Sequence, residues 1–600
     1  MISRVALILL FVFTLRAAPA QTPANSAADI AAQRAAGHQI QLQLDQALAQ
    51  HAARFVIPPG TYRLTPEIPD HAHIVLKQAA NFDLVANGVT ILCETKNTAL
   101  ALWQCHNVTI EGLTIDYDPL PMTQGTITAI TPGGFDFKID DGYSPLQYDG
   151  KGVGHIWVAD AKTRLIKPGS ANYGTDPKNI IHIGDNLYHF TRKSSFYGIA
   201  PGDHIKFPQK LNLKSPHAVN LFNCQSVTFQ NVTIESAPCF GFVSTWGDGL
   251  VLDHVRVVPG PPPPGATEPR IFSSSADGIN LENDRRGPIV RNCTVQSNGD
   301  DGIAVYNQPD TVLAQQPDGT IQIGTVWGDP RVEPYNPGDM LRFFLKTSGR
   351  IVEAKVTEVK PGPTGPALKP ILDALQLPPQ AFFRSILVRL DAPVTTALDD
   401  RVLNTQFTGR GFQITGNTLI NDASRGITLN YSYGDVSQNH IEHSYLPAIH
   451  MTEFMKDAGN GSAFQTSVKI ENNTITDPCI AYTVNPGWNA AISLIASGPF
   501  AHSLDGYSNI AITGNSIDRL NGPGIYVTSA TNVSIENNTF GDLERVGAAK
   551  IGAPAIQLSR VNGAAIHNNI LAGSGWEQPD SELSISSDCF NVSLENGLIK

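Results

Sequence analysis

Residues 510–517 read Ile-Ala-Ile-Thr-Gly-Asn-Ser-Ile, and residues 533–540 read Val-Ser-Ile-Glu-Asn-Asn-Thr-Phe. The same pattern, two β-branched runs separated by Asn or Gly, recurs at 106–115, 226–234, 412–419 and 468–475. Its interval is regular in places, because Asn515 and Asn537 are 22 residues apart, as are Asn417 and Asn439. The other intervals are longer, as loops of variable size would make them.

A β-run, a tight turn at Asn or Gly and another β-run every ~22 residues are typical of a stacked β-solenoid. Asn and Gly accept the left-handed backbone of such turns. A β-sandwich would instead show turns every ~8–12 residues and clearer hairpin signals. The repeat therefore predicts an all-β fold, a right-handed parallel β-helix.

The composition of the 600-residue chain agrees with a β protein. Only 16% of the residues are charged, against ~25% in average globular domains, and the helix-favouring Lys and Glu are scarce. The formal net charge is −12, and no basic run stands out. These features argue against nucleic acid or an anionic membrane surface as a partner.

The first twenty residues are typical of a signal peptide. Arg4 precedes an 11-residue apolar run from Val5 to Leu15, which is too short to span a bilayer. Ala18-Pro-Ala20 supplies the small residues of a cleavage site before Gln21. No later run reaches ~18 apolar residues, so we expect a soluble, exported protein, secreted or periplasmic, without a membrane span.

Two stretches interrupt the repeat and divide the chain. Residues 118–210 and 310–405 contain alternating strand patterns and turn signals. We expect two inserted β subdomains there, the second a small barrel. The β-helix then occupies 21–117, 211–309 and 406–600. Helical spacing of Ile40, Leu44, Ala47 and Leu48 predicts an N-terminal helix that caps the solenoid.

The residues that indicate chemistry precede the second interruption. Asp277 and Asp300 are 23 residues apart, about one coil, and Asp301 follows directly. Strands of neighbouring coils are ~4.8 Å apart, so we expect these carboxylates to lie side by side on one face. Mutual repulsion raises the pKa of at least one of them, which suits a general acid beside a general base. Two alternatives stay open: Asp residues that only close turns, and a carboxylate Ca²⁺ site.

The sequence gives no other indication of a metal or cofactor. Seven Cys and 16 His are present, but none of them has the spacing of a metal-ligand set. We therefore expect no metal ligands of this kind and no cofactor.

Asp277, followed one coil later by Asp300 and Asp301, resembles the catalytic arrangement of inverting β-helix glycosidases. Polygalacturonases have this arrangement, but Ser275 replaces their Asn, and their Gly-His-Gly and Arg-x-Lys motifs are missing here. The three Asp residues and the two interruptions are more similar to glycoside hydrolase family 110, the exo-acting α-1,3-galactosidases. The resemblance implies inversion at the anomeric carbon, with Asp300 as general acid and with Asp277 and Asp301 activating water.

Five further residues are candidates for binding substrate. An exposed Trp can stack on a sugar ring, and the alternative for such a residue is to anchor a loop. Arginines bind hydroxyl or acidic groups, and the alternative is a solvated surface pair. For the candidates after the second interruption, the alternative is packing in the core or on the surface. The five are Trp246, Arg285 (beside Arg286), Arg425, Tyr431 and Glu453.

We therefore expect an exported, exo-acting glycoside hydrolase, similar to an inverting α-galactosidase, whose partner is an oligosaccharide or polysaccharide. Three alternatives remain on the same scaffold: a polysaccharide lyase, an endo-polygalacturonase-like enzyme, and a non-catalytic carbohydrate-binding solenoid. The oligomeric state is left open by the sequence.

Overall fold

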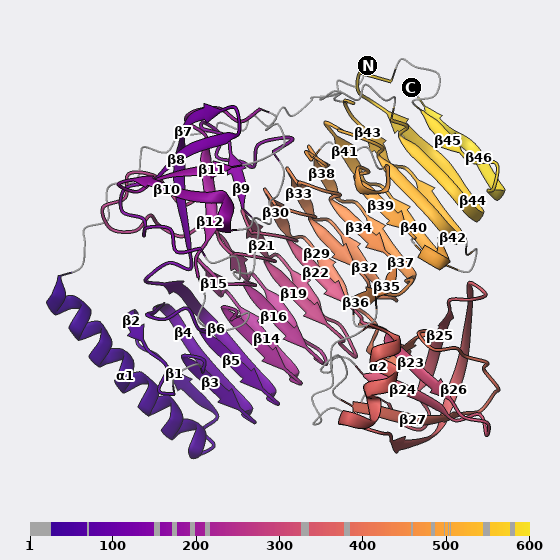
Figure 1. Cartoon of the computed structure of the whole chain (residues 1–600), viewed down its shortest axis with the longest axis horizontal. Coiled ribbons are helices and arrows are strands. Elements are labelled where there is room, and N and C mark those ends of the chain that lie inside the picture. The colour runs from indigo at the N-terminus through magenta and orange to yellow at the C-terminus, as the bar shows by residue number, and fades with distance from the viewer. Residues whose placement is uncertain are drawn as a thin grey trace, which may run out of the picture.

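In the computed structural model, the chain forms a long parallel β-helix that carries two inserted β subdomains (Figure 1). The predicted signal peptide, residues 1–20, lies outside the described residues. The structure describes residues 26–68, 71–148, 156–170, 177–191, 198–210, 216–325, 335–376, 384–457, 460–481, 486–496, 498–501, 503, 506–543, 553–576 and 582–599.

Each coil of the β-helix contributes strands to three faces, and every strand pairs in parallel with its equivalents on the neighbouring coils. Face 1 contains β3 (Ile74–Lys77), β5 (Leu100–Trp103), β13 (Val219–Phe222), β16 (Phe242–Thr245), β19 (Ile279–Glu282), β22 (Ile303–Tyr306), β31 (Ile427–Leu429), β34 (Ile449–Thr452), β39 (Ile492–Ile495) and β45 (Leu583–Ile585).

Faces 2 and 3 follow face 1 along each coil. Face 2 contains β1 (Arg54–Val56), β14 (Gln225–Gln230), β17 (Val251–Asp253), β20 (Ile289–Arg291), β29 (Gln413–Thr415), β32 (Gly434–Ser437), β37 (Thr466–Glu471) and β40 (Tyr507–Thr513). Face 3 contains β2 (Gly60–Leu64), β15 (Thr233–Ile234), β18 (Arg256–Val257), β21 (Thr294–Gln296), β30 (Thr418–Ile420), β33 (His440–Glu442), β38 (Thr474–Thr476), β41 (Ser516–Asp518) and β43 (Thr539–Phe540).

Some long strands bend around a corner and contribute to more than one face. They are β4 (Ala80–Cys93), β6 (His106–Tyr117), β42 (Ile525–Glu536), β44 (Ile556–Leu571) and β46 (Phe590–Ile599). A short antiparallel pair, β35 (Phe454–Asp457) and β36 (Asn460–Ser462), follows β34. The expected all-β class and parallel β-helix are confirmed.

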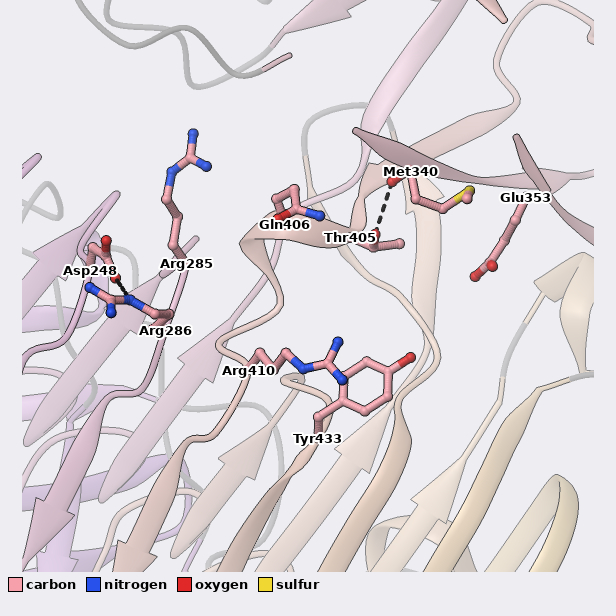
Figure 2. A pocket seen from close by; sticks show the side chains of 9 residues that line it. All are labelled: Asp248, Arg285, Arg286, Met340, Glu353, Thr405, Gln406, Arg410 and Tyr433. Atoms are coloured by element: carbon pink, nitrogen blue, oxygen red, sulfur yellow. Dashed lines mark hydrogen bonds and ion pairs between the residues drawn. The ribbon is translucent and has the colours of Figure 1, made fainter. Parts of the chain in front are cut away.

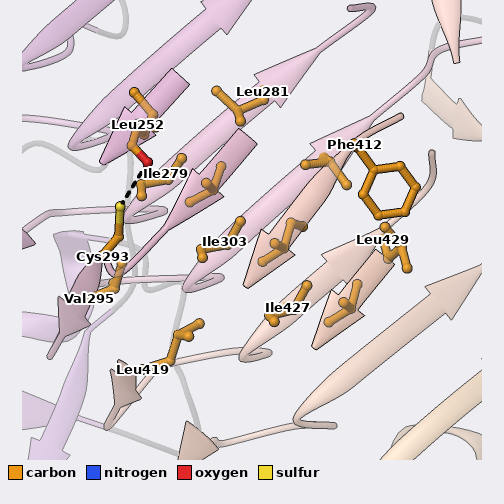
Figure 3. Close-up of a cluster of buried hydrophobic side chains, with 14 of the residues drawn as sticks. Leu252, Ile279, Leu281, Cys293, Val295, Ile303, Phe412, Leu419, Ile427 and Leu429 are labelled. Carbon is orange, nitrogen blue, oxygen red and sulfur yellow. Dashed lines mark hydrogen bonds between the residues drawn. The ribbon is translucent and has the colours of Figure 1, made fainter. Parts of the chain in front are cut away.

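Apolar side chains stack in rows inside the β-helix and set the register between coils. Ile279, Ile303 and Ile427 are paired across three coils, and all three are fully buried. Leu281 and Leu429 lie in the next inward row (Figure 3). Each such side chain stabilises the fold by ~1.5–3 kcal/mol relative to exposure, so a shifted register would expose several of them at once.

The recurrent Asn residues have two different roles. In the Asn-Asn or Gly-Asn pairs of the repeat, the first residue adopts a left-handed backbone, as at Asn472 (φ 56°) and Asn537 (φ 56°). The second residue is buried and joins a side-chain ladder, in which each Nδ2 donates to the next Oδ1 at 2.9–3.0 Å. The ladder runs through Asn417, Asn439, Asn473, Asn515, Asn538 and Asn569.

The first insertion is a mixed-length antiparallel sheet in the order β10-β11-β8-β7-β12-β9. Its apolar core includes Ala423, Tyr445 and Ile480 of the β-helix, so the sheet packs on the turns that connect face 3 to face 1. The strands are β7 (Met122–Thr131), β8 (Gly134–Ile139), β9 (Trp157–Ala159), β10 (Ile180–Gly184), β11 (Leu187–Thr191) and β12 (His204–Pro208).

The second insertion is a closed antiparallel barrel in the order β23-β24-β27-β26-β25-β28. It lies on the opposite side of the β-helix from the first insertion (Figure 1). A short helix, α2 (Lys369–Ala374), precedes β27. The strands are β23 (Asp310–Gln315), β24 (Ile321–Thr325), β25 (Met340–Leu345), β26 (Arg350–Pro361), β27 (Arg384–Leu390) and β28 (Arg401–Asn404).

The N-terminal helix α1 (Ala27–Ala49) lies over the first coils of the solenoid (Figure 1). It begins at Ser26, whose hydroxyl accepts from the backbone N of Asp29 while Asp29 accepts from Ser26 in return. Ile40 and Leu44 face the core and are buried. Among the described residues, no helix is both long enough and apolar enough to cross a membrane.

Candidate active site

Three successive coils carry the same short motif at the turn that leads into face 1: Asp277-Gly-Ile, Asp301-Gly-Ile and Arg425-Gly-Ile. Because the isoleucines of these motifs are paired across coils, Asp277, Asp301 and Arg425 stack in one line. The turn has no room for a side chain at Gly278, where a Cβ would lie 2.7 Å from the carbonyl O of Gly302. In each motif, the Asp or Arg before the glycine is therefore held in position next to a tightly packed backbone.

The neighbour of Asp277 on the next coil is Asp301, whereas the interval of 23 residues had suggested Asp300. The backbone N of Gly278 donates to the carbonyl O of Asp301 at 2.9 Å, which confirms the alignment. Asp300 comes one residue earlier and is half-buried, while Asp277 is 5% and Asp301 2% exposed. Asp277 and Asp301 are thus in register on adjacent coils, and Asp300 is offset by one residue and more accessible.

Asp301 is held as an anion by donors from the neighbouring coil. Its carboxylate accepts from Nη1 of Arg425 at 3.0 and 3.2 Å, from the Thr428 hydroxyl at 2.6 Å and from the Tyr306 hydroxyl at 3.2 Å. Burial alone would raise the pKa of Asp301, but the Arg425 guanidinium and these hydrogen bonds hold that pKa below its usual value.

Asp277 has the opposite electrostatic environment. Burial raises the pKa of Asp277 well above its usual value, and the charges of Asp300 and Asp301 raise it further. The amide of Asn280 donates to Oδ2 of Asp277 at 2.7 Å and partly offsets this effect. The two environments therefore bias Asp277 toward its protonated form and Asp301 toward its ionised form. A cluster of carboxyls with strongly perturbed pKa values indicates a functional site.

A lysine from the first insertion enters the same site. Lys206 on β12 is fully buried, and its Nζ donates to the carbonyl O of Ser275 at 3.4 Å. Burial lowers the pKa of Lys206 to about 7, while the nearby charge of Asp300 acts in the opposite direction. The insertion thus places a cationic group beside Asp300 and forms one wall of the site.

The outer surface of face 1 next to the carboxyls carries an aromatic pair and a row of polar side chains. Asn280, Thr428 and His450 follow one another in register on this face, with Ala304 between the first two. The ring of His450 lies 4.9 Å from that of Trp488, and the Arg425 guanidinium lies 4.9 Å from the same indole ring. Burial lowers the pKa of His450 well below its usual value, so this ring is neutral.

His450 is fully buried, and neither of its ring nitrogens has a hydrogen-bond partner among the described residues. Buried polar atoms are normally paired, so these nitrogens are suited to a ligand hydroxyl. Trp488 is half-buried and offers a ring face for stacking on a sugar. Both were missed from the sequence, although the 22-residue interval from Thr428 to His450 places the histidine on this face.

Two residues predicted to bind substrate lie at the opposite end of the face-1 strands from the Asp residues. Trp246 follows β16 and packs edge-to-face on Phe407, with ring centroids 4.9 Å apart. Arg285 lies beyond the C-terminal end of β19, and its Cζ lies 4.3 Å from the centroid of the Phe407 ring. Neither residue is part of the site built around the Asp residues.

The surroundings of the three remaining candidates for substrate contact favour supporting roles. Arg425 binds Asp301 directly, so it acts through that carboxylate. Tyr431 is fully buried, and its hydroxyl donates to Oδ2 of Asp284 at 3.0 Å, which makes it a support for a turn. Glu453 is 1% exposed and follows the C-terminal end of β34, away from the Asp residues. Periodicity located these residues near face 1 but could not tell which way each side chain points.

Within the described ranges, no group of three or more His, Cys, Asp or Glu side chains is arranged to hold a metal ion. Arg425, Thr428 and Tyr306 all donate hydrogen bonds to the Asp301 carboxylate.

A family comparison agrees with the β-helix architecture. Residues 405–597 match the model of a right-handed β-helix region. Among solved structures, the A-module of a mannuronan C-5 epimerase from Azotobacter vinelandii is 10% identical, with coverage of 93% of this chain and 95% of that one and a TM-score of 0.38. The catalytic domain of a GH87 α-1,3-glucanase is 10% identical, with coverage of 92% and 66% and a TM-score of 0.39. Similarity this loose assigns no role to individual residues.

Curated relatives extend over most of the chain. α-1,3-galactosidase A of Bacteroides fragilis is 21% identical over 586 residues, which is 89% of each protein. α-1,3-galactosidase B of Bacteroides thetaiotaomicron is 20% identical over 275 residues, 43% of each protein. These relatives agree with the resemblance noted from the sequence: over most of its length the chain is similar to proteins named α-1,3-galactosidases.

Proposed function

We propose that this protein is an exported, exo-acting α-galactosidase that removes terminal α-1,3-linked galactose with inversion of configuration. The observation that carries the proposal is the carboxyl cluster, in which Asp277 and Asp301 are aligned on adjacent coils and have pKa values shifted in opposite directions. The names of the curated relatives support galactose and the α-1,3 linkage. The sequence of residues 1–20 supports export.

The aligned pair is suited to activating water. Because Arg425 keeps Asp301 ionised, the pair retains a negative charge even when Asp277 is protonated. A water molecule bound between the two carboxyls loses a proton to the pair as its oxygen attacks the anomeric carbon. The bond between that carbon and the glycosidic oxygen breaks on the opposite side.

Asp300 is the group suited to protonating the leaving oxygen. It is the most exposed of the three carboxyls, and its offset by one residue separates it from the Asp277–Asp301 pair. Inversion requires an acid and a base ~6.5–9.5 Å apart, and carboxyls that diverge from adjacent coils can satisfy this separation. After the reaction, the proton taken up by the pair returns to Asp300 through solvent.

The first insertion supports exo action. Its sheet packs on the turns that precede face 1 and delivers Lys206 against the turn at Ser275. The insertion thereby closes one side of the site. A closed side favours binding of the end of a glycan chain over binding of an internal segment of a polysaccharide.

The test is a release assay with purified mature protein on defined disaccharides. We expect free galactose from galactosyl-α-1,3-galactose and much less from the α-1,4 and α-1,6 isomers. Release of an unsaturated, ultraviolet-absorbing product would favour a lyase, and binding without any release would favour a carbohydrate-binding protein. Either result would contradict the proposal.

A further inference from the structure

We propose that a second site, between the β-helix and the inserted barrel, binds an anionic group of a glycan, either a sulfate ester or a carboxylate. This inference deepens the proposed function, because it assigns acidic galactose-containing glycans as the substrate class. The site is a pocket of about 380 Å³, within the usual range for ligand sites. It lies beyond the C-terminal ends of the face-1 strands, where residues of the β-helix and of the barrel line it together (Figure 2). The Asp cluster lies at the N-terminal ends of these strands.

The floor of the pocket is a column of turn residues from four coils. Backbone hydrogen bonds connect the coils in order, from Gly249 N to Arg286 O, from Gly287 N to Arg410 O and from Gly411 N to Tyr433 O. Asp248, Arg286, Arg410 and Tyr433 therefore follow one another along the helix axis.

The charges in this column are not balanced. Nε of Arg286 donates to Asp248 at 2.6 Å, so these two residues neutralise each other. Arg410 and Arg285, which also lines the pocket, have no ion pair with any of the described residues. On the barrel side, Glu353 is paired with Arg342 at 2.7 Å. The guanidinium groups of Arg285 and Arg410, which are unpaired among the described residues, therefore make the electrostatic potential of the pocket positive.

Both of these arginines are oriented by aromatic rings. Cζ of Arg410 lies 4.6 Å from the centroid of the Tyr433 ring, and Cζ of Arg285 lies 4.3 Å from that of Phe407. A guanidinium that stacks on a ring keeps its N–H edge available, and this planar edge matches the oxygens of a carboxylate or sulfate. Arg410 is exposed and Arg285 half-buried, so a ligand has access to both.

The remaining lining suits a sugar more than a bare ion. Gln406 and Thr405 contribute polar groups, and Met340 contributes an apolar surface from the barrel. The net charge of the whole chain is −12, which disfavours anions elsewhere on the surface. An acidic substituent would therefore direct a glycan to this pocket.

Equilibrium binding tests this proposal without requiring turnover. Calorimetry would compare three thio-linked galacto-oligosaccharides, which resist hydrolysis: one sulfated, one with a terminal galacturonate and one neutral. We expect at least one acidic ligand to bind ~10-fold more tightly than the neutral one, with an affinity that falls as salt rises. Arg410→Gln and Arg285→Gln should each weaken that binding by ~10-fold. Arg389→Gln, on the exposed outside of the barrel, is the matched control.

Equal affinities for acidic and neutral ligands would overturn the proposal, as would arginine variants that bind like the control. Inorganic sulfate is included as a probe, and binding as tight as that of the sulfated oligosaccharide would overturn the assignment to glycans. Melting curves followed by circular dichroism verify that the variants fold. If the acidic ligands bind as expected and no galactosidase activity is found, the pocket stands and the proposed function fails.

Discussion

The two ends of the face-1 strands differ in charge, burial and construction. At the N-terminal ends of β19 and β22, Asp277 and Asp301 are almost fully buried. Side chains on neighbouring coils, such as Arg425 beside Asp301, shift the pKa values of these carboxyls. At the C-terminal ends, the arginines around the 380 Å³ pocket are accessible and oriented by aromatic rings. The buried end is suited to chemistry and the open end to recognition.

This difference shows how a β-helix separates stability from function. The strands hold the core, so the turn residues at either end are able to vary without loss of the apolar rows. The strand between the two ends, β19, is 4 residues long, or about 13 Å. One glycan can therefore contact both ends. Substitutions at each end, or in the Asn ladder that supports the coils, distinguish their roles.

The largest effect is expected from the carboxyl cluster. Asp277→Asn, Asp300→Asn and Asp301→Asn preserve shape but remove a titrating group, so each should lower kcat by ~10²–10⁴. Initial rates on galactosyl-α-1,3-galactose measure this effect. Asp253→Asn, which removes a carboxylate on face 2 that pairs with Arg291, is the control for loss of a carboxylate. Near-normal rates in two of the three variants would mean that these residues only close turns.

The second effect concerns pH. Arg425 and its hydrogen bonds keep the pKa of Asp301 low, so the base is ionised down to low pH in the wild type. Arg425→Gln removes the positive charge, the pKa of Asp301 rises, and the acidic limb of the kcat/KM profile should move to higher pH. Arg291→Gln removes a surface arginine that pairs with Asp253 and serves as the control. An unchanged acidic limb would show that Asp301 is not the group that titrates there.

The third effect compares the aromatic residues of the two ends. Trp488 lies against Arg425 and His450, so Trp488→Ala should lower kcat/KM for a small nitrophenyl galactoside by ~10-fold, mainly through KM. Trp246→Ala, which removes a ring packed on Phe407, should leave the value for this small substrate near that of wild type. The reverse ranking would place the sugar at the other end.

The smallest effect on activity is expected from the Asn ladder, which is remote from the cluster and serves stability. Asn473 accepts from the backbone N and Nδ2 of Asn439 and donates to Val436. Asn473→Ala leaves buried groups unpaired and should lower the free energy of unfolding by about 3 kcal/mol. Asn532→Ala breaks an exposed pair with Asn509 and should cost far less. Similar denaturant midpoints for the two variants would contradict the role of burial.

Local sequence patterns predicted the solenoid, the Asn and Gly residues at its turns, and the position of the three Asp residues on adjacent coils. The Asn-Gly turns and the β-branched runs act within single coils, so they are readable from the chain alone. The residue that lies beside Asp277 on the next coil could not be predicted from the sequence. The rows of paired isoleucines set the register between coils, and a shift of one residue exchanges Asp300 for Asp301. Lys206, Trp488 and the Arg410 pocket depend on contacts between distant segments, for which the sequence carries no spacing signal.

The central claim, hydrolysis by single displacement at the Asp cluster, is tested most directly by the configuration of the first product. Proton NMR would follow the wild-type protein acting on an α-galactoside from the earliest time points, before the anomers of free galactose equilibrate. Attack by water from the side of the Asp277–Asp301 pair predicts that β-galactose appears first and the α-anomer later. Initial release of α-galactose would contradict the account, even if all three Asp residues proved essential.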